Sequence, residues 1–377
     1  MSLSFGILST YPPTACGLAT FTRSLSTQLG AAGSRTGVVR VVDDYDDLAT
    51  TGHNVVGHLW AGSPDSIAAA ASTLSTYDVA VVQHEFGIYG GADGADVDDV
   101  IEQLTAPAIV VAHTVLSTPT RHQREVFERV IDGSAAMVTL SVNARDRLLE
   151  AYDIDPRSVF VIPHGSLPSS RADAPTVHTG PPTILTWGLL GPGKGIEMVI
   201  DALPTLRSMN SVPNYKVVGQ THPKVLARDG ETYRHALMAR AIDRGVARQV
   251  SFDGHYVNAA ALNQVVAGAD VVVLPYESRE QVTSGVLTEA VAAGKPVVAT
   301  AFPHAIELLS SGAGLVVPHD DPAALAQAIQ RVLTEPGLAT AMTGRSSALA
   351  AQMRWPAIAA QYQHLADALL SLPLAAA

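Results

Sequence analysis

The sequence has 377 residues, 47% of them hydrophobic, which is enough for two domains with sizeable cores. It carries 24 basic and 35 acidic residues, a formal net charge of −11, and no basic block stands out. Neither nucleic acid nor an anionic membrane is therefore expected as its main partner. The single cysteine, Cys16, excludes disulfides and cysteine-rich metal sites. With no signal-peptide pattern and no apolar run of about 18–20 residues, we expect a cytoplasmic protein without an integral membrane segment.

Short apolar runs recur through the first half of the chain, and most of them precede a helical pattern. Runs without polar alternation are typical of strands that a parallel sheet buries on both faces. The predicted strands lie in residues 3–8, 36–42, 79–83, 108–113, 136–141 and 159–165, with a loop after 42, and the predicted helices are 17–33, 97–104, 120–131 and 143–152. Their alternation indicates βαβ units and a doubly wound sheet.

The pattern breaks between Pro163 and Thr183, a stretch rich in proline, serine and small polar residues that we interpret as a linker. Alternation then resumes, with predicted strands in 183–190, 215–220, 249–254, 270–276, 296–300 and 314–318 and predicted helices in 197–209, 230–244, 260–269, 286–294 and 322–333. We therefore predict two Rossmann-like domains, residues 1–172 and 181–354. Residues 355–372 are amphipathic and need a partner surface.

Residues 271–300 carry the clearest chemical pattern, because a buried strand, a polar turn and a helix beginning near Ser284 or Gly285 follow one another. The start of that helix lies at the carboxyl end of a strand, where open α/β sheets bind ligands, and its N–H groups and dipole favour a diphosphate. Glu289, in the same helix, can accept two hydrogen bonds from ribose hydroxyls. The alternative is a helix capped by Thr283 or Ser284, with Glu289 on a solvated face.

This stretch resembles the donor-binding signature of family-4 retaining glycosyltransferases, and the chain is similar to their mannosyltransferase-like members. GLLGPGKGIEMVIDAL (188–203) resembles the family's glycine-rich phosphate loop, and STYPPTACGLATFTRSL (9–25) resembles its acceptor-side loop. The resemblance covers nearly the whole chain. It implies an α/β protein of the GT-B fold, with two Rossmann-like domains facing each other across a cleft. Residues 355–377 would form a C-terminal helix that crosses back and completes the N-terminal domain.

The same resemblance implies which residues bind the donor. The nucleotide sugar would contact Gly17, Gly188, Lys194, Tyr256 at the base, Ser284, Gly285, Val286, Leu287 and Glu289. His113, at the end of a predicted strand, would lie beside the reacting sugar.

Two positions depart from the family pattern. The residue eight positions before Glu289 is Gln281 instead of glutamate, so either Glu280 or Gln281 would take the place of the family's first glutamate. With His113, these two are the predicted catalytic residues. A glutamine can hold a sugar hydroxyl by hydrogen bonds but supplies no charge. The basic residue common after the first glycine of the phosphate loop is also replaced, by Leu189, and Arg279 would offer a second cation.

The implied reaction moves a hexose from a nucleotide-sugar donor to a hydroxyl of a soluble sugar or oligosaccharide and forms an α-glycosidic bond. Retention implies that the leaving phosphate helps to deprotonate the acceptor, which fits a sequence without a strong base constellation. GDP-mannose is favoured over UDP-glucose as donor. No cofactor is expected and no divalent metal is essential, because a helix N-terminus and Lys194 can stabilise the leaving group. The oligomeric state stays open.

Three alternatives remain. Two Rossmann-like halves also suit a dinucleotide-dependent oxidoreductase, but no G-x-G-x-x-G follows the first strand. A GT-B epimerase or hydrolase would share the donor site without an acceptor groove. The replacement at Gln281 also allows a non-catalytic sugar-nucleotide binder.

Three further features have competing interpretations. Residues 84–94 would line the acceptor groove or form a flexible surface loop. His164 replaces a common asparagine and would order the interdomain loop. The run His319, Asp320, Asp321 reads better as a helix cap before Pro322 than as a metal site.

Overall fold

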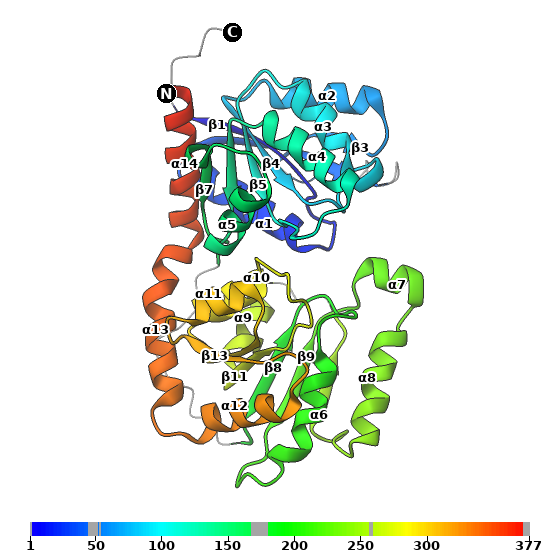
Figure 1. The fold of residues 1–377 in the computed structure, drawn as a ribbon, viewed down its shortest axis with the longest axis vertical. Helices are drawn as coiled ribbons and strands as arrows, with labels where there is room; N and C mark the ends of the chain where they lie inside the picture. The colour runs from blue at the N-terminus through cyan, green and yellow to red at the C-terminus, as the bar shows by residue number, and fades with distance from the viewer. Residues whose placement is uncertain (1, 44–51, 53, 167–179, 256–258, 372–377) are drawn as a thin grey trace. The chain divides into compact units, whose positions relative to one another are not determined.

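The computed structural model describes residues 2–43, 52, 54–166, 180–255 and 259–371, which divide into two units (Figure 1). The first unit combines Met1–Gly165 with Trp355–Ala377, and the second is Ser166–Arg354. In each unit the described strands form one sheet with helices packed on it. Within the described ranges, no helix is both long enough and apolar enough to cross a membrane.

The sheet of the first unit has seven parallel strands in the order β3-β2-β1-β4-β5-β6-β7. Its strands are β1 (Ser4–Ser9), β2 (Arg35–Val42), β3 (Val55–Trp60), β4 (Val79–His84), β5 (Ala108–Ala112), β6 (Ala136–Thr139) and β7 (Val159–Val161). Every residue of β1, β4 and β5 is buried, as continuous apolar runs in a parallel sheet require. The winding direction reverses between β1 and β4.

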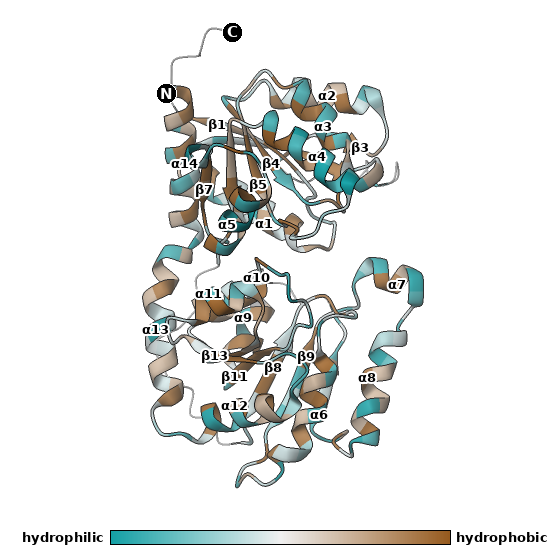
Figure 2. Cartoon of the chain, viewed as in Figure 1, coloured by the Kyte–Doolittle hydropathy of each residue, from teal (hydrophilic) through white to brown (hydrophobic). Residues whose placement is uncertain are grey.

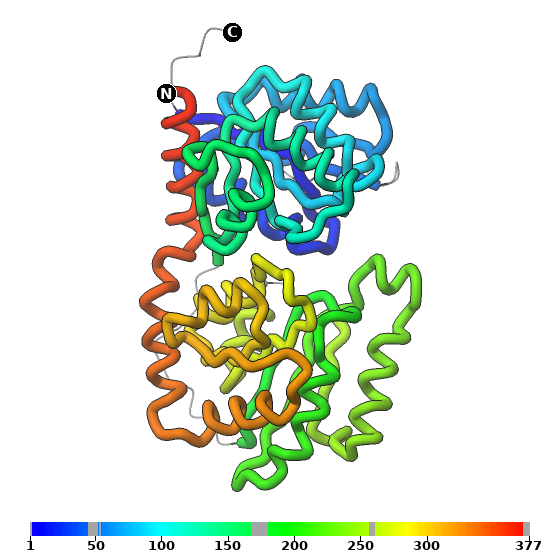
Figure 3. The backbone as a smooth tube through the Cα atoms, in the orientation of Figure 1, coloured from blue at the N-terminus to red at the C-terminus, as the bar shows by residue number. Residues whose placement is uncertain are grey.

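The helices of the first unit come from both ends of the chain. They are α1 (Gly17–Ala31), α2 (Pro64–Leu74), α3 (Asp96–Glu102), α4 (Arg121–Asp132), α5 (Val142–Ala151) and α14 (Trp355–Ser371), with short 3-10 turns η2 (Ala92–Gly94) and η3 (Pro156–Ser158). Figure 3 shows the red helix α14 beside the blue helix α1, and the two are in contact. Because Trp355, Ile358, Tyr362 and Leu365 of α14 join Phe5 and the other sheet residues in one core, this helix is part of the first unit.

The sheet of the second unit has six parallel strands in the order β10-β9-β8-β11-β12-β13, and here the winding reverses between β8 and β11. Its strands are β8 (Thr183–Trp187), β9 (Asn214–Val218), β10 (Val250–Asp253), β11 (Val271–Leu274), β12 (Val297–Thr300) and β13 (Gly314–Val317). Figure 2 colours the inner strands of both sheets brown, in keeping with their burial.

Apolar side chains of the second unit gather in two clusters, which the sheet separates. Helices α6 (Ile196–Leu206), α8 (Thr232–Asp243) and α12 (Pro322–Thr334) supply one, and α9 (Ala259–Ala267), α10 (Gly285–Ala292) and α11 (Pro303–Leu309) supply the other. Helices α7 (Pro223–Asp229) and α13 (Leu338–Met353) complete the unit. Since neighbouring residues of β8 enter different clusters, this inner strand is buried on both faces.

The structure corrects the predicted loop after residue 42, because β3 and α2 follow there. Strand β3 lies at the sheet edge, is half exposed and carries Gly57 and His58, so it lacks the continuous apolar run of the inner strands. The helix predicted over 230–244 is α8, and α7 precedes it, separated by Gly230 at a φ of 62°.

Candidate functional site

The reversal of winding in the second unit places two loops side by side at the carboxyl ends of β8 and β11. Open α/β sheets bind their ligands at such a reversal. The loop after β8 runs through Gly188 and Lys194 to the start of α6, and the loop after β11 runs to the start of α10. The backbone N–H of Glu277 donates to the carbonyl of Gly193 at 3.0 Å, which joins the two loops directly.

Glycine is required where backbone segments approach closely in and beside these loops. A Cβ atom on Gly219 would lie 1.9 Å from the carbonyl oxygen of Gly188, and one on Gly195 would lie 1.8 Å from that of Pro275. Both glycines also have a positive φ, 139° and 64°. Gly188 itself faces Val286 at the start of α10, since its Cβ would lie 3.6 Å from a methyl of that valine. The predicted phosphate loop and the predicted donor helix are therefore neighbours.

Lys194 is supported by an aromatic ring. Its Nζ lies 4.6 Å from the centroid of the Tyr276 ring, and Phe302 stacks on that tyrosine with centroids 5.2 Å apart. Burial, followed by the charges of Lys224 and Lys194, lowers the pKa of His222. Because Lys194 forms no ion pair with any described residue, its charge is available to an anion.

Helix α10 begins with part of its N–H groups already bonded. Ser284 is the N-cap, and its Oγ accepts from the N–H of Leu287 at 3.2 Å. The N–H of Ser284 donates to Nδ1 of His304 at 2.9 Å. The N–H groups of Gly285 and Val286 make no hydrogen bond within the described part of the chain. These two donors, with the helix dipole, form an anion-binding end.

Glu289 lies one turn into α10, beside Trp187 at the end of β8. Burial raises the pKa of its carboxyl, and the nearby indole of Trp187 offsets part of that effect. The indole N–H makes no hydrogen bond of normal geometry with a described residue. The carboxylate is thus held in a largely desolvated place where hydroxyl donors would satisfy it.

The polar turn before α10 contains Glu280 and Gln281, the two candidates for the place of the family's first glutamate. The Gln281 amide nitrogen donates to the carbonyl of Thr283 at 3.0 Å, so this side chain folds back on its own loop. Glu280 is exposed. Arg279 is exposed as well and lies 3.4 Å from the carboxylate of Asp320. Its proposed role as second cation therefore competes with an existing ion pair.

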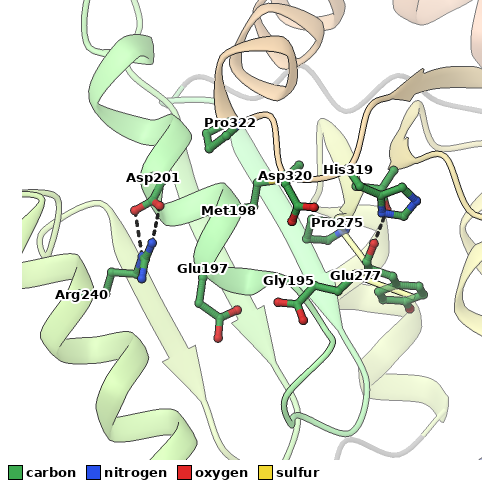
Figure 4. Close-up of a pocket in the computed structure, with 12 residues that line it drawn as sticks. Gly195, Glu197, Met198, Asp201, Arg240, Pro275, Glu277, His319, Asp320 and Pro322 are labelled. Atoms are coloured by element: carbon green, nitrogen blue, oxygen red, sulfur yellow. Dashed lines mark hydrogen bonds and ion pairs between the residues drawn. The ribbon is translucent and has the colours of Figure 1, made fainter. Parts of the chain in front are cut away.

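A cavity of about 370 Å³ adjoins the phosphate loop in the second unit (Figure 4). Its charged lining is mainly acidic, with Glu197, Asp201, Glu277 and Asp320, and its one arginine, Arg240, is paired with Asp201. Partial burial, followed by the charges of Glu197 and Asp320, raises the pKa of Glu277. Such walls repel a diphosphate, which favours the start of α10 and Lys194 as the place for one.

The first unit presents the loop between β1 and α1 at its own reversal of winding. Helix α1 begins at Gly17, and Cys16 caps it, with Sγ accepting from the N–H of Ala19 at 3.3 Å. A Cβ atom on Gly17 would meet no atom within 4 Å. Cys16 is thus the N-cap of α1, and Gly17 borders open space in this unit.

His113 follows β5 and is held by a glutamine. Its Nε2 lies 2.6 Å from Oε1 of Gln83, so Nε2 carries the proton and Nδ1 is free to accept. Its ring packs edge-on against Phe21, with centroids 5.0 Å apart. Burial, followed by the charges of His164 and His84, lowers the pKa of His113 to about 3. It is therefore a neutral hydrogen-bonding group, not a cation.

The remaining predicted features have mixed outcomes. In the loop 84–94, Tyr89 is buried and its hydroxyl donates to the Gln83 carbonyl at 2.7 Å, which anchors the loop, while a role toward an acceptor stays a prediction. The cap before α12 is confirmed, because Asp321 Oδ1 accepts from the N–H of Ala324 at 2.8 Å. Tyr256 lies outside the described residues.

Three residues of this region are not among the predicted site residues. His304 bonds Ser284, Phe302 stacks on the Tyr276 ring beside Lys194, and Trp187, which precedes Gly188 in the chain, lies beside Glu289. The available signal is position, since Trp187 lies in one predicted strand and Phe302 and His304 follow the end of another.

Comparisons with known proteins show which proteins this chain resembles. The family model for glycosyl transferases group 1 matches residues 181–335. A D-inositol 3-phosphate glycosyltransferase of Jonesia denitrificans is 29% identical over 250 residues, 60% of this chain and 55% of that protein. A GDP-mannose-dependent alpha-(1-6)-phosphatidylinositol monomannoside mannosyltransferase of Mycobacterium tuberculosis is 29% identical over 255 residues, 63% of each chain. This chain spans 55% and 63% of the length of two curated D-inositol 3-phosphate glycosyltransferases that it matches.

Two solved structures share the fold over nearly the full chain. A glycosyltransferase from Rickettsia africae has a TM-score of 0.78 at 15% identity, covering 99% of this chain and 100% of that one. Anabaena HepE in complex with UDP and glucose has a TM-score of 0.75 at 17% identity, covering 97% and 100%. At these identities the similarity shows the fold alone, which is the GT-B fold.

Proposed function

We propose, from the premise that residues 181–335 of this chain are a glycosyl transferases group 1 domain, that the protein is a retaining glycosyltransferase with a nucleotide-sugar donor. It would transfer a hexose to a hydroxyl of a soluble sugar or oligosaccharide and form an α-glycosidic bond. The observation that carries this proposal is the donor site of the second unit. There two open N–H groups, one lysine without an ion pair and one half-buried carboxylate surround a single reversal of the sheet.

The chemistry follows from these groups. The N–H groups of Gly285 and Val286, with Lys194, would stabilise the charge that develops on the leaving diphosphate. Glu289 would hold the ribose hydroxyls and so fix the nucleotide. The leaving phosphate would take the acceptor proton, and neutral His113 would contribute a hydrogen bond beside the sugar. No residue in this scheme depends on a divalent metal.

Glu280 and Gln281 are the candidates for the sugar end of the donor. Gln281 uses its amide nitrogen within the loop, so its Oε1 would face the ligand as an acceptor. Glu280, exposed on the same turn, would supply a charge. Separate substitutions, Glu280→Gln and Gln281→Ala, decide between them, and activity unchanged in both would overturn this placement of the sugar.

GDP-mannose is our first choice of donor, because the mycobacterial relative at 29% identity is named as GDP-mannose-dependent. UDP-glucose is the second candidate, because HepE, a structural neighbour, has been solved with UDP-glucose. A thermal-shift screen of UDP-, GDP- and ADP-sugars separates them. GDP-mannose is expected to raise the unfolding temperature most, and a response to UDP-glucose alone would reverse the order.

The reaction class needs a product assay. Incubation with the selected donor and a panel of soluble sugars, followed by NMR of the anomeric proton, should show an α-linked product. The same reaction in EDTA should proceed at a similar rate. Release of free sugar without any transfer would instead favour a hydrolase, and binding without turnover would favour a non-catalytic binder.

Substitution of Lys194 tests the phosphate site directly. Lys194→Met should weaken binding of GDP or UDP by about 10- to 100-fold, because a charge-assisted hydrogen bond to phosphate is lost. Lys194→Arg keeps the charge and should retain part of the affinity. Isothermal titration calorimetry measures both. Equal affinity for the Met variant and the unsubstituted protein would place the diphosphate elsewhere.

A further inference from the structure

The end of β12 and the segment after it contact the turn between β11 and α10, here called the donor loop, through every second residue, Thr300, Phe302 and His304. Thr300 Oγ1 donates to the carbonyl of Tyr276 at 2.6 Å, and the Phe302 ring stacks on the ring of the same tyrosine. His304 reaches the far end of that loop. One short segment, 300–304, therefore contacts both the beginning and the end of the turn that leads into α10.

His304 holds the end of the turn at two points. Its Nδ1 accepts from the backbone N–H of Ser284 at 2.9 Å, and its own backbone N–H donates to the carbonyl of Gln281 at 3.3 Å. The residue is buried, with 5% of its surface exposed. Because a backbone N–H can only donate, Nδ1 must be unprotonated, and the neutral ring carries its proton on Nε2.

This contact decides which donors of α10 remain open. The Ser284 N–H is bonded to His304, and the Leu287 N–H is bonded to the Ser284 side chain. Of the N–H groups at the start of the helix, Gly285 and Val286 are left without an acceptor among the described residues. A shift of Ser284 would rotate the first turn and redirect both groups.

We propose that His304 is a positioning residue, which fixes the start of α10 so that the N–H groups of Gly285 and Val286 meet the donor diphosphate. This inference rests on the proposed function. His304 touches neither phosphate nor sugar in it, and acts through Ser284. Its contribution is the acceptor atom at Nδ1.

A matched pair of variants isolates that atom. His304→Asn places Oδ1 where Nδ1 lies, whereas His304→Leu has nearly the same shape and no acceptor. In the full-length protein we expect the Asn variant to bind GDP and UDP within about threefold of the unsubstituted chain, and the Leu variant about tenfold more weakly, the scale of one lost hydrogen bond. The KM for the donor should rise in the Leu variant, and the KM for the acceptor should not.

The outcomes separate this inference from the function on which it rests. If the unsubstituted protein binds no nucleoside diphosphate, the proposed function fails and this inference with it. If it binds and the Leu variant binds equally well, only the role of His304 is overturned. Equal loss in the Asn and Leu variants also overturns it, since the acceptor atom would then not matter.

A measurement on the unsubstituted protein covers the case of a Leu variant that does not fold. In ¹⁵N NMR of histidine-labelled protein, the His304 signals, assigned by their loss in His304→Asn, should show a bare Nδ1 and a protonated Nε2. A protonated Nδ1 contradicts the contact with Ser284 and overturns the inference without any binding assay.

Discussion

The carboxylate of Glu289 would favour nucleotide binding, but its desolvation lowers the stability of the folded protein. Burial raises the pKa of its carboxyl, so ionising this group costs more in the folded state than in the unfolded state. Its favourable contribution is complete below the unfolded pKa, near 4.3, and is lost as the pH rises through the higher folded pKa. Hydrogen bonds from a ligand would offset the desolvation of the carboxylate at neutral pH, and ribose hydroxyls are the donors that we propose.

The substitution Glu289→Gln should therefore weaken nucleotide binding without destabilising the protein. We expect about tenfold lower affinity for GDP or UDP, because a hydrogen bond to a charged acceptor is replaced by one to a neutral acceptor. Denaturant unfolding at pH 4.5 and 7.5 should show the unsubstituted protein losing stability relative to the Gln variant as the pH rises. The opposite trend would indicate that the carboxylate is stabilised in the folded state.

His113 should stay neutral across the physiological pH range. Burial and the neighbouring histidines lower its pKa to about 3, and its Nε2 proton is held by Gln83. The ¹H–¹³C signals of its ring should not change between pH 5 and 8, while free histidine in the same sample titrates near pH 6.5. A His113 signal that titrates in this range would show that the ring is more hydrated than its burial indicates.

At the scale of elements, α14 is held by apolar burial and carries one hydroxyl without a partner. Tyr362 is fully buried, and its hydroxyl makes no hydrogen bond with any described residue. Tyr215 is equally buried, but its hydroxyl donates to Thr186 Oγ1 at 3.0 Å. The two tyrosines form a natural comparison, because they differ in hydrogen bonding and not in exposure.

We expect Tyr362→Phe to be neutral or to stabilise the protein by up to about 1 kcal/mol, since it removes a desolvated and unsatisfied hydroxyl. Tyr215→Phe should instead destabilise it by about 1 kcal/mol. Urea unfolding of both variants measures the difference. A loss of stability in Tyr362→Phe that matches Tyr215→Phe would show that the α14 hydroxyl has a partner.

Local sequence signals predicted the ends of several helices correctly. Ser284 before α10 and Asp321 before α12 are N-caps that bond the N–H groups expected of them. The same signals missed α13, where Met342, Ser346, Ala350 and Met353 are buried at spacings of three and four but alanine fills the face between them. The buried face of α13 is therefore set by the elements that pack against it and not by a polar and apolar division in its own sequence.

At the scale of the whole molecule, the two units differ in how the chain completes them. The second unit is continuous, and both of its apolar clusters lie within residues 184–353. The core of the first unit needs Trp355, Ile358, Tyr362 and Leu365 from the last helix. Burial of such side chains is worth about 1.5–3 kcal/mol each, comparable in sum with the 5–15 kcal/mol stability of a typical domain.

Fragments should therefore behave differently. Residues 166–354 alone should unfold cooperatively and bind GDP or UDP, because the proposed donor site lies within that unit. Residues 1–165 alone should lack cooperative unfolding, and addition of a 355–377 peptide should restore it. Circular dichroism and calorimetry measure both results. A stable 1–165 fragment would show that α14 is dispensable to the first core.

The sequence by itself determined the alternation of strands and helices, the two Rossmann-like halves, and the loops that would bind phosphate. Local hydrophobic periodicity, glycine positions and helix caps indicate those features, and none of these signals depends on residues far away in the sequence. Only the tertiary structure decided that His304 bonds Ser284, that Phe302 supports the Tyr276 ring under Lys194, and that Gln83 fixes the His113 tautomer. The order of the strands brings distant segments together. Lys194 and Tyr276, whose contact spans the longest sequence separation of these, are 82 residues apart, and Phe302 stacks on the same tyrosine. Parallel strands bring their carboxyl ends to one edge in an order that winding, not sequence proximity, sets.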